Sequence, residues 1–293
     1  MKASDLILES QASILMKGPF GHGKTLAAAT FAADGPIWIA YWDKKRPVEL
    51  YHFFHHVIKR PELLKNIEYD VYTSHNANEY LNRLFTLSND CRYFAVINDS
   101  VTNMTSAAVN WSLGFRSSKL KNKDKIMPEF DEYKIETSLV CQSLDICKSL
   151  PCHVIWTCHP VPSVKIEGVG SSIKVTKTNP IVTYGSKVAG IVPGNFSEIY
   201  HFSKESTWDQ QTGKQRIGYK VTTEAIGDDF AKSNLGLKGE FDITDRLFYE
   251  VWLEKVKQLR EDIKHDVDTH EGKPINPFAN TANLSQETNT WKT

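Results

Sequence analysis

The stretch that decides the fold reads Gly18-Pro19-Phe20-Gly21-His22-Gly23-Lys24-Thr25 and fits the pattern G-x-x-x-x-G-K-[ST]. It follows an apolar segment at residues 13–17 that is typical of a strand, and it opens an alanine-rich segment at residues 24–33 that is typical of a helix. Glycines in such a turn let backbone N–H groups converge on phosphate oxygens, and the start of the helix adds partial positive charge. The stretch therefore predicts a phosphate-binding loop at residues 18–25.

Two side chains of this loop and one residue farther along the chain predict a site for ATP and Mg²⁺. We expect Lys24 to reach the β- and γ-phosphates as a point charge and Thr25 to offer its hydroxyl to the metal. The metal also needs an acidic partner on a neighbouring strand, and Asp99 ends the apolar run at residues 94–99. We expect Asp99 to hold Mg²⁺ through water that Asn98 orients; a simple turn residue is the alternative for Asp99.

Hydrolysis of ATP needs a base that polarises the attacking water. Asp43, just past the second expected strand, is the first candidate, and Glu49 is the second. A surface turn residue beside two lysines is the alternative reading of Asp43. His159 ends an apolar run, so its imidazole can sense the γ-phosphate or serve only the end of the strand. His22 lies inside the loop, and we expect it to face solvent.

Composition excludes some classes of protein. The 293 residues carry 35 basic and 35 acidic side chains, so no global basic field points to nucleic acid, and such binding must come from local patches. The sequence predicts neither a signal peptide nor a membrane helix, and hence a cytoplasmic protein. The five cysteines form no CxxC pair, so we expect reduced thiols; a zinc site at Cys158 and His159 is the less favoured alternative.

Strand-like and helix-like segments alternate, which predicts an α/β fold with a mainly parallel sheet covered by helices and antiparallel strands at one edge. We expect one domain over residues 1–264 and a disordered tail over residues 265–293. Further expected strands cover residues 36–41, 69–72, 92–98, 152–157, 198–203 and 217–222, and further helices cover residues 48–58, 76–87, 132–150 and 244–263.

Two stretches between these elements lack a clear pattern and contain many lysines. Residues 114–127 carry Arg116, Lys119, Lys121, Lys123 and Lys125 with few apolar side chains, so we expect a mobile loop. Residues 160–195 are irregular and contain Lys165, Lys174, Lys177 and Lys187. Tyr184 and Phe196 are candidates for stacking on bases. Both loops could bind single-stranded DNA, and solvated charge is the alternative for each.

The motifs occur in the order of a RecA-like P-loop ATPase core, which residues 10–240 resemble. Asn98-Asp99-Ser100-Val101-Thr102 is similar to the Asp-Ser signature of that family. The run LPCHVIWTCH at residues 150–159 resembles the sensor strand of phage nucleotide-binding ATPases. Residues 190–200 and 231–237 resemble the last strands of the same phage group, which includes single-strand annealing proteins of the Sak type.

The resemblance implies ATP hydrolysis with Mg²⁺, binding of single-stranded DNA through two loops, annealing or recombination, and a phage gene acting in the host cytoplasm. It also implies a homo-oligomer in which a neighbouring subunit supplies a basic residue; Lys187 and Arg216 are the candidates. A single-strand DNA-binding protein is a further expected partner, and a membrane is not. Two departures stand out: Asp43 replaces the usual Glu, which predicts slow turnover, and His159 replaces the usual Gln.

Two other functions compete with this one. A P-loop ATPase can act on a protein partner, in packaging or regulation, without contacting DNA. A nucleoside or small-molecule kinase is the third candidate, but the sequence has no arginine-rich lid, and its long Ser/Gly/Lys loop suits a polymer better than a small acceptor.

Overall fold

The computed structural model describes residues 11–43, 47–119, 128–161, 163–167, 174–178, 181–209, 213–224 and 231–270. The chain divides into two compact units between Val256 and Lys257. The last described helix, α8 (Phe248–His270), contributes residues to both units and extends past the start of the tail expected at residue 265. Among the described residues, no helix is both long and apolar enough to span a bilayer.

One large sheet organises the first unit, with strands in the order β11–β9–β8–β1–β5–β4–β2–β3 and β10 paired to β8. Neighbours from β8 to β3 run parallel, whereas β9, β10 and β11 are antiparallel to their partners. The strands are β1 (Ser13–Lys17), β2 (Ile37–Tyr41), β3 (Ile67–Val71), β4 (Ala95–Asp99), β5 (His153–Cys158), β8 (Glu198–Asp209), β9 (Lys214–Thr222), β10 (Lys232–Ser233) and β11 (Glu240–Asp242). This arrangement confirms the predicted fold class.

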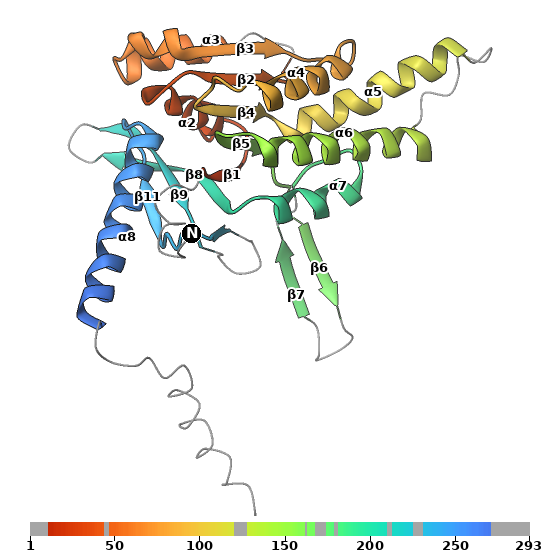
Figure 1. Ribbon diagram of the computed structural model, residues 1–293. Coiled ribbons are helices and arrows are strands. Elements are labelled where there is room, and N and C mark those ends of the chain that lie inside the picture. Colours follow the sequence, from red (N-terminus) through yellow and green to blue (C-terminus); the bar gives the residue numbers. More distant parts are fainter. Residues whose placement is uncertain are drawn as a thin grey trace, which may run out of the picture. The chain divides into compact units, whose positions relative to one another are not determined.

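Helices cover both faces of this sheet (Figure 1). On one face, α4 (Ala77–Asn89), α5 (Val101–Lys119) and α6 (Phe130–Ser149) share a core with side chains such as Trp38 and Trp156. On the other, Phe31 packs against Phe248, Tyr249 and Trp252. Shorter helical segments are α2 (Lys24–Ala29), η1 (Thr30–Ala33), α3 (Val48–His52), η2 (Phe53–Val57), η3 (Pro61–Asn66), α7 (Ser186–Ile191) and η5 (Val192–Asn195).

The alternation of side chains along β4 corrects one prediction. Neighbouring residues of a strand point to opposite faces of the sheet. Asp99 therefore faces the phosphate-binding loop, where Thr25 contacts it, while Asn98 faces α5 and accepts a hydrogen bond from Trp42 Nε1 at 2.7 Å. Asn98 is buried on that opposite face, so the prediction that it orients water at the metal is wrong.

The two lysine-rich stretches are more regular than expected. Residues 114–119 belong to helix α5 and not to a loop, while residues 120–127 lie outside the described residues. The stretch at residues 160–195 contains a hairpin of β6 (Ser163–Glu167) and β7 (Lys174–Thr178), followed by α7. Phe196 is buried and packs on Trp156 at 5.7 Å between ring centroids, so it is not a stacking group for bases.

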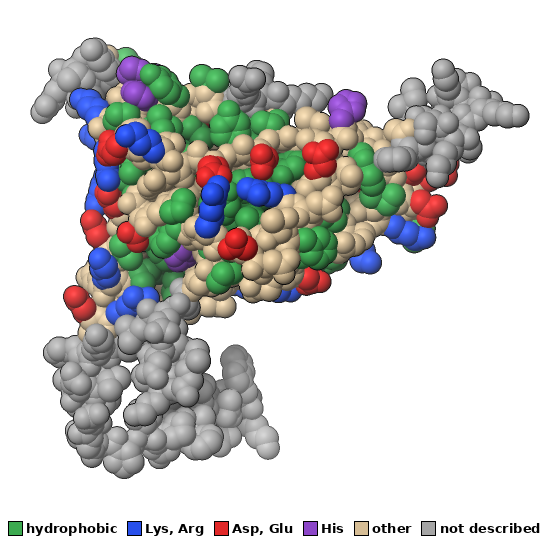
Figure 2. Space-filling model, turned by 45° about the horizontal axis from the view of Figure 1, so that its top comes forward, with side chains coloured by type: hydrophobic (Ala, Val, Ile, Leu, Met, Phe, Trp, Pro, Cys, Tyr) green, Lys and Arg blue, Asp and Glu red, His purple; other side chains and the backbone are tan. Residues whose placement is uncertain are grey.

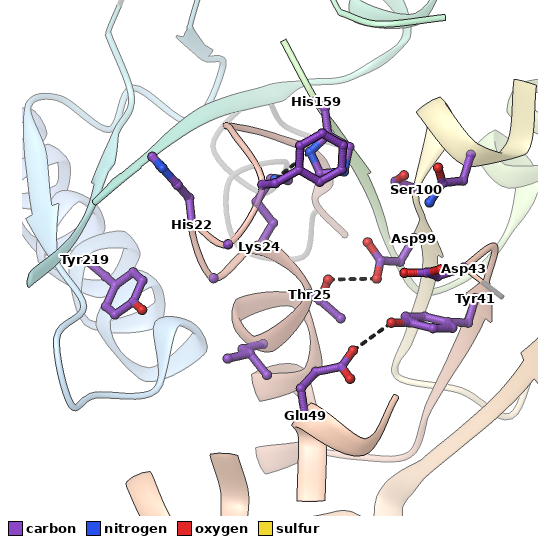
Figure 3. A pocket seen from close by; sticks show the side chains of 15 residues that line it. His22, Lys24, Thr25, Tyr41, Asp43, Glu49, Asp99, Ser100, His159 and Tyr219 are labelled. Carbon is purple, nitrogen blue, oxygen red and sulfur yellow. Dashed lines mark hydrogen bonds between the residues drawn. The ribbon is translucent and has the colours of Figure 1, made fainter. Parts of the chain in front are cut away.

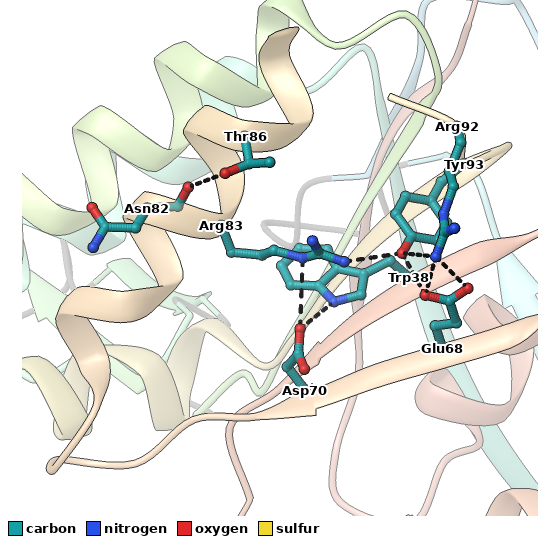
Figure 4. A network of polar contacts seen from close by, with 8 residues as sticks. All are labelled: Trp38, Glu68, Asp70, Asn82, Arg83, Thr86, Arg92 and Tyr93. Carbon is teal, nitrogen blue, oxygen red and sulfur yellow. Dashed lines mark hydrogen bonds and ion pairs between the residues drawn. The ribbon is translucent and has the colours of Figure 1, made fainter. Parts of the chain in front are cut away.

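A polar network fastens the edge strand β3 to β2 and α4 (Figure 4). Asp70 accepts a hydrogen bond from the buried Trp38 Nε1 at 2.8 Å and pairs with Arg83 at 3.7 Å. The Arg83 guanidinium also donates to Tyr93 at 3.0 Å, and the Tyr93 hydroxyl donates to Glu68 at 2.6 Å. Asp70 is thus the acceptor that satisfies an otherwise unpaired indole N–H at the rim of the core.

We predict that Asp70→Ala lowers the free energy of unfolding by about 1–3 kcal/mol, because it leaves the buried Trp38 N–H without its acceptor. Urea denaturation followed by circular dichroism measures the change. The matched control is Asp145→Ala, which removes an exposed ion pair with Lys148 on α6 and should change stability by less than about 0.5 kcal/mol. Equal stability of the two variants contradicts the assigned role of Asp70.

Candidate functional site

Lys24 is at the centre of a cavity of about 290 Å³ at the carboxyl ends of the parallel strands (Figure 3). Its ammonium group donates to the carbonyl oxygens of Gly18 at 2.6 Å and Pro19 at 2.8 Å. A third contact joins Lys24 Nζ to His159 Nδ1 at 3.1 Å. The lysine is buried, and all three contacts hold it beneath the loop that the sequence predicts to bind phosphate.

Glycine is required at three positions of this loop. Gly21 and Gly23 adopt φ values of 72° and 81°, which residues with a side chain rarely adopt. A Cβ atom on Gly18 would lie 2.5 Å from the carbonyl oxygen of Phe202 in β8. The loop is therefore shaped by backbone constraints, and it forms the kind of left-handed turn in which successive N–H groups bind anions.

Thr25 and Asp99 form the pair that the sequence predicts to hold the metal. The Thr25 hydroxyl donates to Asp99 Oδ2 at 2.8 Å, and Thr157 donates a short hydrogen bond to Asp99 Oδ1. Burial raises the pKa of Asp99 above its usual value, and these two hydrogen bonds and the charge of Lys24 offset the rise only in part. A hydroxyl that donates to a carboxylate still has lone pairs for a cation, so this donor set fits Mg²⁺; Thr25 and Asp99 are the residues that would hold it.

His159 contacts the loop in two ways. Its Nδ1 accepts from Lys24, so the ring proton lies on Nε2, and Phe20 stacks on the imidazole with 3.7 Å between ring centroids. Burial and the charge of Lys24 lower the pKa of His159 to about 4. The imidazole is therefore neutral at pH 7. This arrangement connects the end of β5 directly to the phosphate-binding lysine.

The charge state of Lys24 is sensitive to pH near neutrality. Burial lowers the pKa of this ammonium to about 8, although the Cys158 thiol and the Asp99 carboxylate raise it. A phosphate group in the cavity supplies further negative charge and favours the charged lysine. Binding of a phosphate ligand should therefore be accompanied by uptake of a proton when the pH is above about 8.

Both candidates for the base line the same cavity. Asp43 follows β2 and is exposed, and Glu49 lies in the first turn of α3, where its carboxylate accepts a hydrogen bond from Tyr41 at 2.7 Å. Burial raises the pKa of Tyr41, so its hydroxyl keeps its proton and remains a donor to Glu49. The side chain of Glu49 is thus fixed by a partner, and either carboxylate remains a candidate for activating water.

Tyr219 of β9 lies on the opposite side of the loop from Asp99 (Figure 3). Together with Gly23 and Leu26 it also lines a second, mainly apolar cavity of about 130 Å³. An apolar cavity beside the predicted phosphate site suits the base of a nucleotide. Sequence reasoning missed Tyr219 and Thr157: Tyr219 reaches the loop only through sheet pairing, whereas Thr157 stands two residues before His159 and so shares its face of β5.

His22 lines the cavity around Lys24, where its ring contacts the carbonyl oxygen of Phe202 at 3.3 Å; it is partly buried and not fully in solvent as expected. The two candidate basic residues for a neighbouring subunit's site lie elsewhere. Lys187 is exposed on α7 and lines a separate cavity, and Arg216 is exposed on β9. Neither of the two lines the cavity around Lys24 in its own chain. Their expected role in a neighbouring subunit's site stays a prediction.

The structure combines an α/β fold and a mainly parallel sheet with a glycine-rich loop, Lys24 and the Thr25–Asp99 pair around one cavity. No family model matches the sequence, and no curated protein matches it either. Among solved structures, a KaiC-like protein from the hyperthermophilic archaeon Pyrococcus horikoshii is similar, with 13% identity over 72% of this chain and 77% of that chain, and a TM-score of 0.37. That likeness is too distant to carry an argument about function.

We predict that Lys24→Ala weakens binding of ATP by about 10- to 150-fold, the usual worth of hydrogen bonds to a charged group. Titration with a fluorescent ATP analogue in the presence of Mg²⁺ measures the change. Lys148→Ala, which removes an exposed lysine on α6, is the matched control and should bind normally. If the Lys24 variant keeps its fold by circular dichroism and binds ATP with unchanged affinity, residues 18–25 are not the phosphate-binding loop.

We further predict that the affinity for ATP is highest below about pH 8 and falls as the pH rises through this value, because Lys24 then loses its charge. His159 stays neutral from pH 5 upwards and contributes no change over this range. Nucleotide titrations from about pH 6.5 to 9.5 test the dependence, and residual binding by Lys24→Ala should lack it. If the affinity of the unmodified protein for ATP does not change with pH over this range, loss of charge on Lys24 does not control binding.

Proposed function

We propose that this protein binds and hydrolyses ATP with Mg²⁺, binds single-stranded DNA, and promotes annealing or recombination as an oligomer encoded by a phage. The observation that carries the ATPase part is the convergence of Lys24, Thr25 and Asp99 in one cavity. The DNA part rests on the motifs shared with RecA-like phage proteins and on the lysine-rich stretches beside α5 and α7.

The charged and polar residues Lys24, Asp43, Glu49 and His159 each have a role in the proposed hydrolysis. Lys24 is positioned to exchange the carbonyl oxygens of Gly18 and Pro19 for phosphate oxygens. Bound Mg²⁺ supplies charge neutralisation on the phosphates. Asp43 or Glu49 accepts the proton of the attacking water, and the neutral imidazole of His159 donates from Nε2 to charge that develops on the γ-phosphate.

The partners follow from the same proposal. Lys187 or Arg216 reaches the nucleotide of a neighbouring copy, because both are exposed and neither contributes to the cavity of its own chain. Acidic and basic side chains are interspersed on the face drawn in Figure 2, in keeping with the zero net charge. DNA binding is therefore local, and a single-strand DNA-binding protein is the further partner proposed.

An ATPase that acts on a protein partner is the alternative, since the nucleotide cavity fits it equally well. Single-stranded DNA accelerates ATP turnover by the proposed DNA-binding protein, whereas a protein partner accelerates turnover by this alternative ATPase. A kinase is the third candidate, and it requires a small acceptor bound beside the γ-phosphate.

We predict that ATP hydrolysis requires Mg²⁺ and is faster with single-stranded DNA than without it. Asp99→Asn should keep part of the nucleotide binding and lose the Mg²⁺-dependent turnover, because the neutral amide no longer attracts the hydrated cation. A coupled assay of released phosphate measures both effects. If single-stranded DNA does not change the rate of ATP hydrolysis, the ATPase that acts on a protein partner is favoured. If Asp99→Asn hydrolyses ATP at the normal rate, Asp99 is not the metal ligand.

A further inference from the structure

An open groove of about 680 Å³ lies between the start of α6 and the start of α7. Three exposed aromatic side chains line it: Phe130 is 73% exposed, Tyr184 44% and Tyr133 36%. We call Phe130, Tyr133, Lys134, Tyr184 and Lys187 the aromatic groove. Other exposed rings, such as Phe85 on α4 and Trp208 on β8, lie on other elements, whereas these three line one groove, and this clustering indicates a binding surface.

The backbone beneath Tyr184 is held in place by several contacts. The buried carboxylate of Glu136 accepts the Gly185 N–H at 3.0 Å, and Thr105 Oγ1 of α5 accepts the Tyr184 N–H at 3.3 Å. A Cβ atom on Gly185 would lie 2.7 Å from Glu136 Oε2, so the turn packs against α6 as closely as a glycine allows. The two tyrosine rings consequently stand 6.0 Å apart at 43° before any ligand binds.

The charges of the groove are positive. Lys134 and Lys187 line it, and no acidic side chain of the described residues does. Lys134 Nζ lies 4.4 Å from the centre of the Phe130 ring and pairs with Asp131 at 3.1 Å, an exposed ion pair that contributes little and exchanges readily. One ammonium group, that of Lys134, thus stands beside an exposed ring, and Lys187 lines the same groove.

We propose that the aromatic groove is the surface on which single-stranded nucleic acid binds, with bases stacked on Tyr133, Tyr184 and Phe130 and phosphates beside Lys134 and Lys187. Exposed rings and lysines in one groove suit a ligand that combines flat bases with negative phosphates. A duplex keeps its bases stacked internally and cannot offer them to these rings. The proposal rests on the proposed function and specifies where the strand lies.

The test compares binding of a fluorescently labelled oligothymidylate by the full chain and its variants. The double variant Tyr133→Ala/Tyr184→Ala should bind about 5- to 150-fold more weakly for each base that loses its stacking partner. The conservative variant Tyr133→Phe/Tyr184→Phe keeps the ring faces and should bind normally. Phe85→Ala, which removes a half-exposed ring on α4 outside the groove, is the matched control and should also bind normally.

Salt dependence tests the lysines separately. Replacing Lys134 by Gln should reduce the slope of log affinity against log salt concentration by about 0.7, the value for one phosphate contact on a single strand. Nucleotide affinity of every variant should match that of the unmodified protein, which also shows that the fold survives. An oligonucleotide carrying photoreactive uracil should cross-link to peptides that contain Tyr133 or Tyr184.

The possible failures can be told apart. If the unmodified protein binds no single strand, the DNA part of the proposed function is wrong, and this inference fails with it. If it binds the strand and the tyrosine double variant binds equally well, the groove is not the binding surface while the proposed function stands. If the double variant loses self-association in sedimentation experiments while its monomer binds the strand with full affinity, the groove is an interface between copies, and the proposal is overturned.

Discussion

The buried carboxylate of Asp99 is the constraint on which the site depends. Burial of a carboxyl group away from water raises its pKa, and Thr25 and Thr157, which donate to its two oxygens, together with the charge of Lys24 offset part of this cost. These groups come together only because β5 lies between β1 and β4 in the sheet. The order of three parallel strands thus brings into contact residues that are separated by 74 and 58 positions in the chain.

Lys24 gives the loop its second constraint. In the structure its ammonium donates to two carbonyl oxygens of the loop and to His159, so the positive charge is held where a phosphate would bind. The low pKa of about 8 and the neutral state of His159 have one origin, the burial of both groups against each other. A bound phosphate would take the place of the carbonyl partners, and little rearrangement of the loop would be needed because its glycines already define its shape.

The nucleotide cavity and the aromatic groove share one support, the first turns of α5. Thr102 Oγ1 accepts the backbone N–H of His159 at 3.3 Å and donates to the carbonyl oxygen of Val182 at 2.9 Å. One turn later, Thr105 accepts the N–H of Tyr184. His159 at the nucleotide cavity and the segment from Val182 to Tyr184 at the groove therefore both contact the start of α5. The two segments also contact each other, because Val182 N–H donates to the carbonyl oxygen of His159 at 2.7 Å.

Local signals in the sequence determined the loop, most strands and the fold class: a glycine pattern between a strand and a helix and apolar runs of strand length leave few alternatives. They missed α5, because its buried positions include small residues such as Ala107 and Ala108 among Ser, Thr and Asn, and packing rather than helix propensity stabilises it. They also misplaced Asn98 and Phe196, whose environments are set by strand register and core packing. Only the tertiary structure places Tyr219 in the cavity and Tyr184 beside Tyr133, because contacts between distant segments exist only once the sheet has brought them together.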